Sequence, residues 1–266
     1  MNSPDASSLL PKNDPNIDPR IEWERIDQCL CGTSLRDCAI WGWGVCERCG
    51  TWANTHRPTE SSLQFVYGEI YWTTTQQMAG VPLLPQRFEN DFHDRVGTYL
   101  AALLPHLRDG MKITEVGCGN ARLLHELKMR GFDVTGTEFS ADVIAQVAKL
   151  TDVPIVQGTA DDLPAAAFDA VISIDVMEHA HDPRVFLRSH LRLLKPGGIM
   201  MIHTPVHESQ AQVYGYSVGM MWKLYHLWLF SGVLFDELLE EAGLTILDRS
   251  TSLFGWPVVI ARKTAT

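Results

Sequence analysis

Two acidic residues that flank a glycine turn form the pattern with the clearest chemistry in this chain. Glu115 lies two residues before Gly117, Gly119 completes the turn, and Glu138 follows 21 residues after Gly117. Glycine permits a positive φ and lets a ligand approach the backbone without a Cβ in the way. A carboxylate at the position of Glu138 is able to accept hydrogen bonds from both hydroxyls of a ribose. The pattern therefore predicts a site for an adenosine-containing ligand.

The charge of this site distinguishes between the common nucleoside cofactors. A dinucleotide fingerprint requires a third glycine, and Arg122 stands at that position. Glu115 beside the turn would repel a pyrophosphate, whereas it suits a cation. S-adenosylmethionine carries an ammonium and a sulfonium and no phosphate, so the electrostatics favours this cofactor. A nicotinamide-dependent oxidoreductase is the alternative interpretation.

Five of the six cysteines lie close together near the N-terminus, which in a reducing compartment indicates metal binding before disulfides. Cys29-Leu-Cys31-Gly and Cys46-Glu-Arg-Cys49-Gly form two turns separated by 14 residues. Four thiolates suit a tetrahedral, structural zinc, and we predict these four as its ligands. The first turn is one residue shorter than a usual zinc knuckle, so Cys38 is an alternative to Cys29. A redox pair at Cys46 and Cys49 and a set of unpaired core cysteines are further alternatives.

Alternating strands and helices are expected to position the glycine turn. Short β-prone runs alternate with segments of helical period, which predicts an α/β fold with a parallel sheet covered on both faces. Such sheets bind ligands at the carboxyl ends of their strands, where the turn lies. The expected strands are Met111–Val116, Phe132–Glu138, Val153–Gln157, Phe168–Ile174, Ile199–His203, Leu244–Ser250 and Phe254–Arg262. The expected helices are Arg122–Arg130, Ala141–Leu150, Arg184–Leu194 and Ser231–Ala242.

Four stretches of different character divide the chain. Residues 1–24 are rich in Pro, Asp, Asn and Ser, and we expect a mobile leader there. Residues 25–57, here named the cysteine module, carry the zinc ligands. Residues 58–109 form a helical linker, in which apolar side chains recur every three or four positions. Residues 110–266 hold the α/β domain.

Five motifs in the expected order resemble those of class I S-adenosylmethionine-dependent methyltransferases. The resemblance extends from about Phe88 to Lys263 and implies a Rossmann-like, doubly wound, seven-stranded and mostly parallel sheet. The cysteine module resembles the zinc-ribbon extension of some small-molecule and sugar methyltransferases, in which a CxxCG turn, an Arg-Pro-Thr-Glu link and a Tyr-Gly-x-x-Tyr stretch also follow one another. The five motifs are Glu115-Val-Gly-Cys-Gly-Asn-Ala121, Gly136-Thr-Glu-Phe-Ser140, Gly158-Thr-Ala-Asp-Asp-Leu-Pro164, Ile174-Asp-Val-Met-Glu-His179 and Leu194-Lys-Pro-Gly-Gly-Ile199.

The resemblance also implies which residues bind the cofactor. In the third motif, Thr159 replaces the usual aspartate. Recognition of adenine is therefore expected to rest on the backbone of Ala160 or Asp161 and on the Asp161 carboxylate. The full expected set is Glu115, Gly117, Cys118, Gly119, Glu138, Phe139, Ala160, Asp161 and Asp175.

An aromatic-rich segment at about residues 206–230 follows the fifth strand and is predicted to cover the acceptor. Methyl transfer depends largely on holding the nucleophile in line with the leaving sulfur. An oxygen or nitrogen acceptor also benefits from a base near neutral pH, for which histidine is suited. We predict His179 or His207 in this role, with His181 and His226 in reserve. Catalysis by proximity alone is the alternative.

Composition limits the partners of the chain. The formal net charge is -10, which disfavours a general nucleic-acid binder. No run approaches 18 apolar residues and the N-terminus lacks a secretory pattern, so we expect a cytoplasmic protein without a membrane span. The expected acceptor is a small metabolite, sugar, glycan or natural product, methylated on oxygen or nitrogen rather than carbon. An RNA- or protein-modifying methyltransferase that docks its target through the zinc module, and a catalytically silent binding protein, are the alternatives. The sequence does not predict an oligomeric state.

Overall fold

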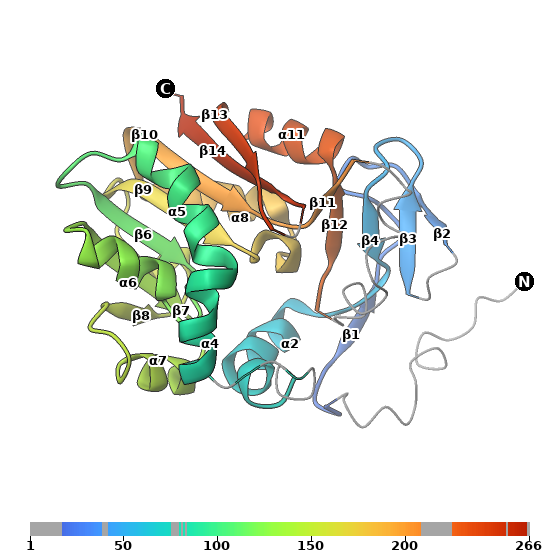
Figure 1. Cartoon of the computed structure of the whole chain (residues 1–266). Helices are drawn as coiled ribbons and strands as arrows, with labels where there is room; N and C mark the ends of the chain where they lie inside the picture. The colour runs from blue at the N-terminus through green and yellow to red at the C-terminus, as the bar shows by residue number, and fades with distance from the viewer. Residues whose placement is uncertain are drawn as a thin grey trace, which may run out of the picture.

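Three β-sheets organise the 266-residue chain in a computed structural model (Figure 1). They have seven, five and two strands, and the largest carries the glycine turn. The structure describes residues 18–38, 42–75, 80, 82, 84–208, 225–253 and 255–264.

The seven-stranded sheet has the order β13-β14-β10-β9-β6-β7-β8. β14 is antiparallel to both of its neighbours, and the remaining strand pairs are parallel. The prediction of a doubly wound, mostly parallel seven-stranded sheet is therefore confirmed. The strands are β6 (Lys112–Val116), β7 (Asp133–Glu138), β8 (Ile155–Gln157), β9 (Phe168–Ile174), β10 (Leu194–His203), β13 (Leu244–Thr251) and β14 (Pro257–Lys263).

Helices cover both faces of this sheet, which is why its central strands are apolar without alternation. In β10, Ile199 and Met201 belong to one buried core, and Met200 and Ile202 belong to the other. Successive side chains of a strand point to opposite faces, so each face receives its own set. One face is covered by α4 (Leu84–Asp91), α5 (Gly97–Leu103), α6 (Arg122–Met129) and α7 (Ala141–Val147), and the other by α8 (Pro183–Leu193) and α11 (Gly232–Glu241).

The predicted elements occur in the predicted order, with shifted ends. Ser140 and Ser231 each accept a hydrogen bond from a backbone amide three residues later, so their side chains set the first turns of α7 and α11. The later part of the predicted helical linker, at residues 84–106, is a continuous helical segment with changes of winding. It comprises α4, the π-helix η2 (Phe92–Val96), α5 and the short 3₁₀ helix η3 (Leu104–His106).

The five-stranded sheet joins parts of the chain that are distant in sequence. Its order is β11-β12-β4-β3-β2. Three strands come from the cysteine module and two come from the segment predicted as the acceptor cover, of which residues 209–224 lie outside the described residues. The strands are β2 (Leu35–Asp37), β3 (Trp43–Cys46), β4 (Trp52–Asn54), β11 (Val206–His207) and β12 (Trp228–Ser231).

The segment before the α/β domain begins with a small sheet. β1 (Trp23–Arg25) pairs with β5 (His56–Pro58), so Trp23 and Glu24, within the predicted leader, belong to ordered structure. α2 (Glu60–Phe65) and the π-helix η1 (Val66–Thr75) follow. Within the described part of the chain, no helix has the length and apolarity needed to cross a membrane.

Candidate active site

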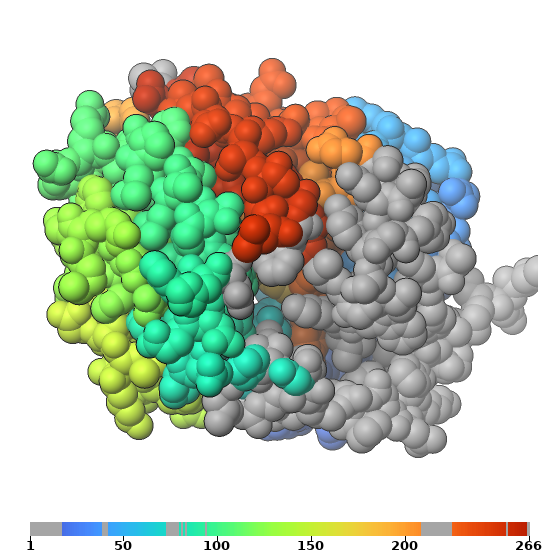
Figure 2. All heavy atoms as spheres, viewed as in Figure 1, coloured from blue at the N-terminus to red at the C-terminus, as the bar shows by residue number. Residues whose placement is uncertain are grey.

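A cavity of about 870 Å³ lies at the carboxyl ends of β6, β7 and β9. This is the end of the sheet at which the sequence predicts a ligand, and the volume falls in the usual range for small-ligand sites. A hollow is visible at the centre of one face, beside α4 in teal and the red C-terminal segment (Figure 2). These two segments contribute Arg87, Asp91 and Trp256 to the lining.

The glycine turn brings backbone against the cavity. Gly117 has φ 72° and Gly119 has φ 52°, the left-handed region that favours glycine. A Cβ on Gly117 would lie 2.8 Å from the side chain of Val176, and one on Gly119 would lie 3.1 Å from Trp72. Only glycine fits both positions without displacing a neighbour. The Cys118 side chain is buried in the core, and burial raises the pKa of its thiol well above the usual value.

Glu138 ends β7 with its carboxylate bound to the glycine turn. One oxygen accepts a hydrogen bond from the Gly119 amide at 3.1 Å, and the other accepts from the amides of Phe139 and Ser140 at 2.9 and 3.1 Å. Burial raises the pKa of Glu138, and these three amides oppose the rise. The carboxylate is thus held rigidly at the cavity, and of its roughly four acceptor sites one, on Oε2, is left for a ligand hydroxyl.

Glu115 is a buried carboxylate without a hydrogen bond to one of its oxygens. Its side chain lines the cavity, and Oε2 has no partner among the described residues. Burial raises the pKa of Glu115 to about 8, although nearby Arg95 limits the rise. A buried carboxylate in this condition is costly unless a cation or donor pairs with it.

The acidic residues and the glycine turn together fit S-adenosylmethionine. The unpaired Glu115 oxygen suits the ammonium of the methionine part, and Glu138 suits a ribose hydroxyl. Because Gly117 and Gly119 have no side chains, a ligand is able to lie directly against the backbone of the turn.

Asp175 follows β9 and is held by two side chains. Its carboxylate accepts hydrogen bonds from Arg95 at 2.5 Å and from His203 at 2.7 Å. Burial would raise the pKa of Asp175, but Arg95 and His203 outweigh it and hold the pKa well below its usual range. Asp175 also has φ 53°, which is uncommon for a residue with a side chain. It lines the cavity as predicted, while its carboxylate is already engaged by protein groups.

The loop expected at the adenine is shaped by Thr159. Its hydroxyl accepts a hydrogen bond from the Asp161 amide at 3.1 Å, and its own amide donates to Asp162 at 2.8 Å. This capping box begins the 3₁₀ helix η4 (Ala160–Asp162). Threonine at the usual aspartate position therefore serves the local turn. Ala160 is buried and the Asp161 side chain is 76% exposed, and both residues line the cavity.

His179 lies at the cavity in η5 (Met177–His179), and its ring orientation is set by contacts to Nδ1. The carbonyl of Tyr225 and the hydroxyl of Tyr67 are both 2.7 Å from this nitrogen. A carbonyl only accepts, so the proton of a neutral ring lies on Nδ1 and the lone pair lies on Nε2. Burial raises the pKa of Tyr67 well above its usual value, so Tyr67 stays neutral.

The two predicted candidates for the base are separated by the fold. His207 is buried in β11 and is not among the described residues that line the cavity. His226 does line it, and its ring centroid lies 4.7 Å from that of His179. One donor atom from each of Glu178, His179 and His226 lies within 4.8 Å of the others, so this cluster has the spacing of a possible metal site.

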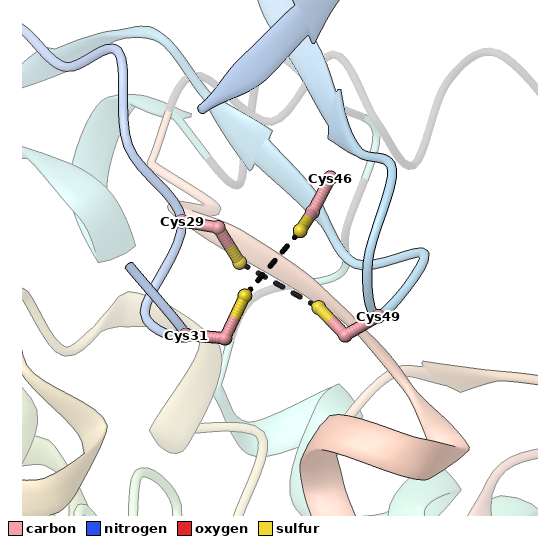
Figure 3. A group of neighbouring side chains, drawn as sticks. All are labelled: Cys29, Cys31, Cys46 and Cys49. Atoms are coloured by element: carbon pink, nitrogen blue, oxygen red, sulfur yellow. Dashed lines mark hydrogen bonds between the residues drawn. The ribbon is translucent and has the colours of Figure 1, made fainter. Parts of the chain in front are cut away.

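The four predicted zinc ligands come together at one point of the cysteine module (Figure 3). The Sγ atoms of Cys29 and Cys49 are 3.7 Å apart, and those of Cys31 and Cys46 are 3.4 Å apart. Four sulfurs around zinc at about 2.3 Å form a tetrahedron with edges of about 3.8 Å. The observed spacing therefore fits a tetrahedral ion. Cys38 is elsewhere, with its thiol donating to the Trp43 carbonyl.

Backbone turns position these cysteines. Gly32 and Gly50 follow the two cysteine pairs with φ 81° and 78°. The Gly32 amide donates to the Cys29 carbonyl and the Gly50 amide donates to the Cys46 carbonyl, each at 2.8 Å. The first turn therefore closes over three residues and the regular second turn over four, each with its glycine in the left-handed region.

Many residues that line the cavity were not part of the predicted site, and three of them make contacts that shape it. Arg95 pairs with Asp175, Tyr67 contacts His179, and Trp72 lies over Gly119. Arg95 and Tyr67 reach partners 80 and 112 residues away in the chain. Only the Tyr-Gly-x-x-Tyr stretch, in which Tyr67 is the first residue, was a signal in the sequence.

Comparison with known proteins identifies the family of the chain. A family described as a methyltransferase domain matches residues 88–249. The ubiquinone biosynthesis O-methyltransferase of Cereibacter sphaeroides is 32% identical over 174 residues, which cover 58% of this chain and 68% of the relative. The protein of the same description from Caulobacter vibrioides is 36% identical over 104 residues, 36% of this chain and 41% of the relative.

Solved structures show the same architecture. A chain in the complex between the Haloferax volcanii Trm112 methyltransferase activator and a methyltransferase superposes with TM-score 0.58 and 17% identity, covering 68% of this chain and 94% of that chain. The Burkholderia thailandensis 1,6-didemethyltoxoflavin-N1-methyltransferase, with bound S-adenosylhomocysteine, superposes with TM-score 0.53 and 21% identity, covering 67% and 84%. The fold and the acidic pocket define a class I S-adenosylmethionine-dependent methyltransferase. The chain belongs to the methyltransferase-domain family, and it is an enzyme of that class.

Replacing Glu115 by glutamine is expected to remove a pH dependence of cofactor binding. In the unliganded protein Glu115 has a pKa of about 8, so below pH 8 a proton must leave before the carboxylate can pair with an ammonium. Affinity for S-adenosylhomocysteine should therefore rise by up to about tenfold per pH unit between pH 6 and 8. Glu115→Gln should bind more weakly and show no such rise. Calorimetry across this pH range measures both effects, and an equal slope in the two proteins would contradict the assignment.

The same substitution is expected to stabilise the unliganded protein. The folded-state pKa of Glu115 lies above its ordinary value of 4.5, so its contribution to stability is lost as the pH rises through about 8. Glu115→Gln should therefore increase the free energy of unfolding at pH 8 by about 2 kcal/mol or more. At pH 4.5 the two proteins should be nearly equal. Thermal unfolding without ligand tests this, and a destabilised variant at pH 8 would show that the carboxylate is paired.

Proposed function

We propose that this methyltransferase acts on an oxygen or nitrogen of a small metabolite, sugar, glycan or natural product. One observation carries the proposal: a single cavity contains the acidic cofactor end at Glu115 and Glu138 and an oriented histidine at His179. The relatives described as O-methyltransferases favour oxygen among these acceptor atoms. The net charge of -10 argues against an RNA acceptor.

In this proposal His179 is the base. When bound, S-adenosylmethionine supplies the methyl group on a sulfonium that leaves as a neutral thioether. Tyr225 and Tyr67 hold the His179 ring so that Nε2 is the accepting nitrogen. The acceptor's proton passes to Nε2 as the bond from its oxygen or nitrogen to the methyl carbon forms and the sulfur–methyl bond breaks.

Cofactor residues are also part of the proposal. Glu115 would hold the ammonium, and Glu138 would accept from a ribose hydroxyl. The remaining predicted contacts, Gly117, Cys118, Gly119, Phe139, Ala160, Asp161 and Asp175, all line the same cavity. We further propose a structural zinc in the cysteine module. Its four thiols must stay reduced to bind the ion, which suits a cytoplasmic location.

His179→Ala is expected to lower the rate of methyl transfer by about 100- to 1000-fold, because a positioned base contributes about that much. Affinity for S-adenosylhomocysteine should change by less than about threefold, since His179 lies in η5, whereas the expected cofactor acids Glu115 and Glu138 lie in β6 and β7. His207→Ala is the matched control and should retain near-wild-type transfer, provided that it folds. The assay follows labelled methyl groups into a metabolite extract. Full activity of His179→Ala would leave proximity as the source of catalysis.

The same labelled extract identifies the acceptor. Incubation with labelled S-adenosylmethionine, followed by mass spectrometry, should reveal a small molecule heavier by about one methylene unit. Label that appears only in RNA or protein would overturn the proposed acceptor class. Binding of S-adenosylhomocysteine without any transfer would instead indicate a binding protein.

A further inference from the structure

β12 pairs with a strand of the cysteine module, although β12 belongs to the segment that follows β10. Trp228 pairs with Ala53 and Leu229 pairs with Trp52 in an antiparallel register. Just before this strand, the Asn54 amide donates to the Leu227 carbonyl at 2.9 Å. One edge of β12 is therefore completed by β4 of the cysteine module.

The same stretch forms part of the acceptor side of the cavity. His226 lines the cavity and directly precedes Leu227. The Leu227 amide donates to the Glu178 carbonyl at 2.8 Å, and the Trp228 indole donates to the Ala180 carbonyl at 2.8 Å. The Tyr225 carbonyl is the partner that orients His179. A shift of β12 would therefore displace both His226 and His179.

Thr51 connects this strand to the zinc ligands. Its hydroxyl accepts from the Ser231 amide at 3.1 Å and lies 3.1 Å from the Ser231 hydroxyl, both within the buried interior. On its other side, Thr51 follows the turn that carries Cys46 and Cys49 and lies two residues after Cys49. The Thr51 carbonyl accepts from the Cys46 amide at 2.9 Å. A short chain of hydrogen bonds thus runs from the backbone of the proposed zinc ligand Cys46 through Thr51 to Ser231 at the end of β12.

The Asn54 side chain adds a second contact of this kind. Its amide nitrogen donates to the His226 carbonyl at 3.4 Å, and its oxygen accepts from the His56 amide at 3.2 Å. Asn54 is 6% exposed, so its polar groups depend on these partners rather than on water. The module therefore contacts the backbone of a cavity-lining residue directly.

We propose that Thr51 and Asn54 are positioning residues. Through them, a metal-ordered cysteine module holds the part of the cavity wall that His226 and His179 form. The inference rests on the proposed function, which makes this part of the wall the acceptor side. The cofactor side is supported by a different part of the fold, since Glu115 and Glu138 lie on β6 and β7 of the large sheet. A module this small buries too little apolar surface to stay ordered without its ion. Loss of the metal therefore reduces the order of the acceptor side and leaves the structure of the cofactor side unchanged.

Hydrogen exchange on the full-length, zinc-loaded protein tests this coupling before any acceptor is known. After treatment with a zinc chelator, amides of residues 225–231 should exchange at least about tenfold faster, while those of β6 and β7 change little. Calorimetry should give an affinity for S-adenosylhomocysteine within about threefold of the loaded protein. Unchanged exchange in residues 225–231 would overturn the coupling. A loss of affinity for S-adenosylhomocysteine of about tenfold, as large as the change in exchange, would show that the effect of the metal is not restricted to the acceptor side.

Substitutions at Thr51 separate positioning from general loss of structure. Thr51→Val, with its zinc content verified, should accelerate exchange in residues 225–231, and Thr51→Ser should restore protection because it keeps the hydroxyl. Thr114→Val is the matched control, since the buried Thr114 hydroxyl has no hydrogen-bond partner in the described structure. Equal behaviour of Thr51→Val and Thr114→Val would overturn the proposal.

Steady-state kinetics with the acceptor found above supplies the functional readout. Thr51→Val should raise KM for the acceptor by about tenfold or more and leave KM for S-adenosylmethionine within about threefold. Equal increases in both constants would overturn the assignment of Thr51 to the acceptor side. If the loaded protein failed to bind S-adenosylhomocysteine, the proposed function would fail, whereas exchange would still report on the coupling.

Discussion

Glu138→Ala is expected to weaken the binding of S-adenosylhomocysteine by about 10- to 100-fold. The carboxylate is oriented by the amides of Gly119, Phe139 and Ser140, so it meets a ribose hydroxyl without reorganising. A charge-assisted hydrogen bond contributes about 1.5–3 kcal/mol, and the loss of one corresponds to about one to two powers of ten in affinity. Calorimetry at pH 8 measures the change directly.

A distant acid provides the control for this experiment. Glu240 is exposed on α11, is not among the described residues that line the cavity, and should tolerate alanine without a change in affinity. Glu138→Gln is a second informative variant. Its NH₂ group would replace one of the two carboxylate oxygens and would face a backbone N–H, so two hydrogen-bond donors would oppose each other. This variant should therefore bind S-adenosylhomocysteine poorly, although glutamine is similar in size to glutamate. Wild-type affinity in Glu138→Ala would remove Glu138 from the cofactor site.

Cys49→Ser is expected to abolish stoichiometric zinc and to destabilise the cysteine module strongly. The Cys49 thiol lies 3.7 Å from that of Cys29, within the group of four whose ligand atoms are all within 4.8 Å. Structural zinc in small modules contributes on the order of 10 kcal/mol to folding, so loss of one ligand should lower the free energy of unfolding by several kcal/mol. Native mass spectrometry counts the zinc, and chemical unfolding measures the stability.

Cys38→Ser is the matched control, because Cys38 was the alternative ligand. Its thiol donates to the Trp43 carbonyl at 3.1 Å and is not a member of the group of four. This variant should keep one zinc per chain and lose only about 1 kcal/mol of stability. Loss of zinc in Cys38→Ser together with retention in Cys29→Ser would reverse the assignment. Wild-type protein that binds no zinc would exclude the metal altogether.

Features encoded within a few residues could be read from the sequence alone. The turn at Gly117 and Gly119, the acid at the end of the second strand and the two short cysteine turns are local patterns. Each depends on backbone φ, on strand period or on spacing along one segment. The apolar runs of β9 and β10 likewise indicated strands buried on both faces, and the sheet confirms them. These features determined the class of the fold and the chemistry expected of its cofactor.

Contacts between distant segments were decided only by the tertiary structure. The pairing of β12 with β4, the ion pair of Arg95 with Asp175 and the contact of Tyr67 with His179 have no local signature. The same holds for the placement of His207 in the five-stranded sheet rather than at the cavity. Such contacts depend on which apolar surfaces are buried together, and that choice minimises the free energy of the whole chain. Periodicity in one segment specifies a buried face but does not specify the partner that covers it.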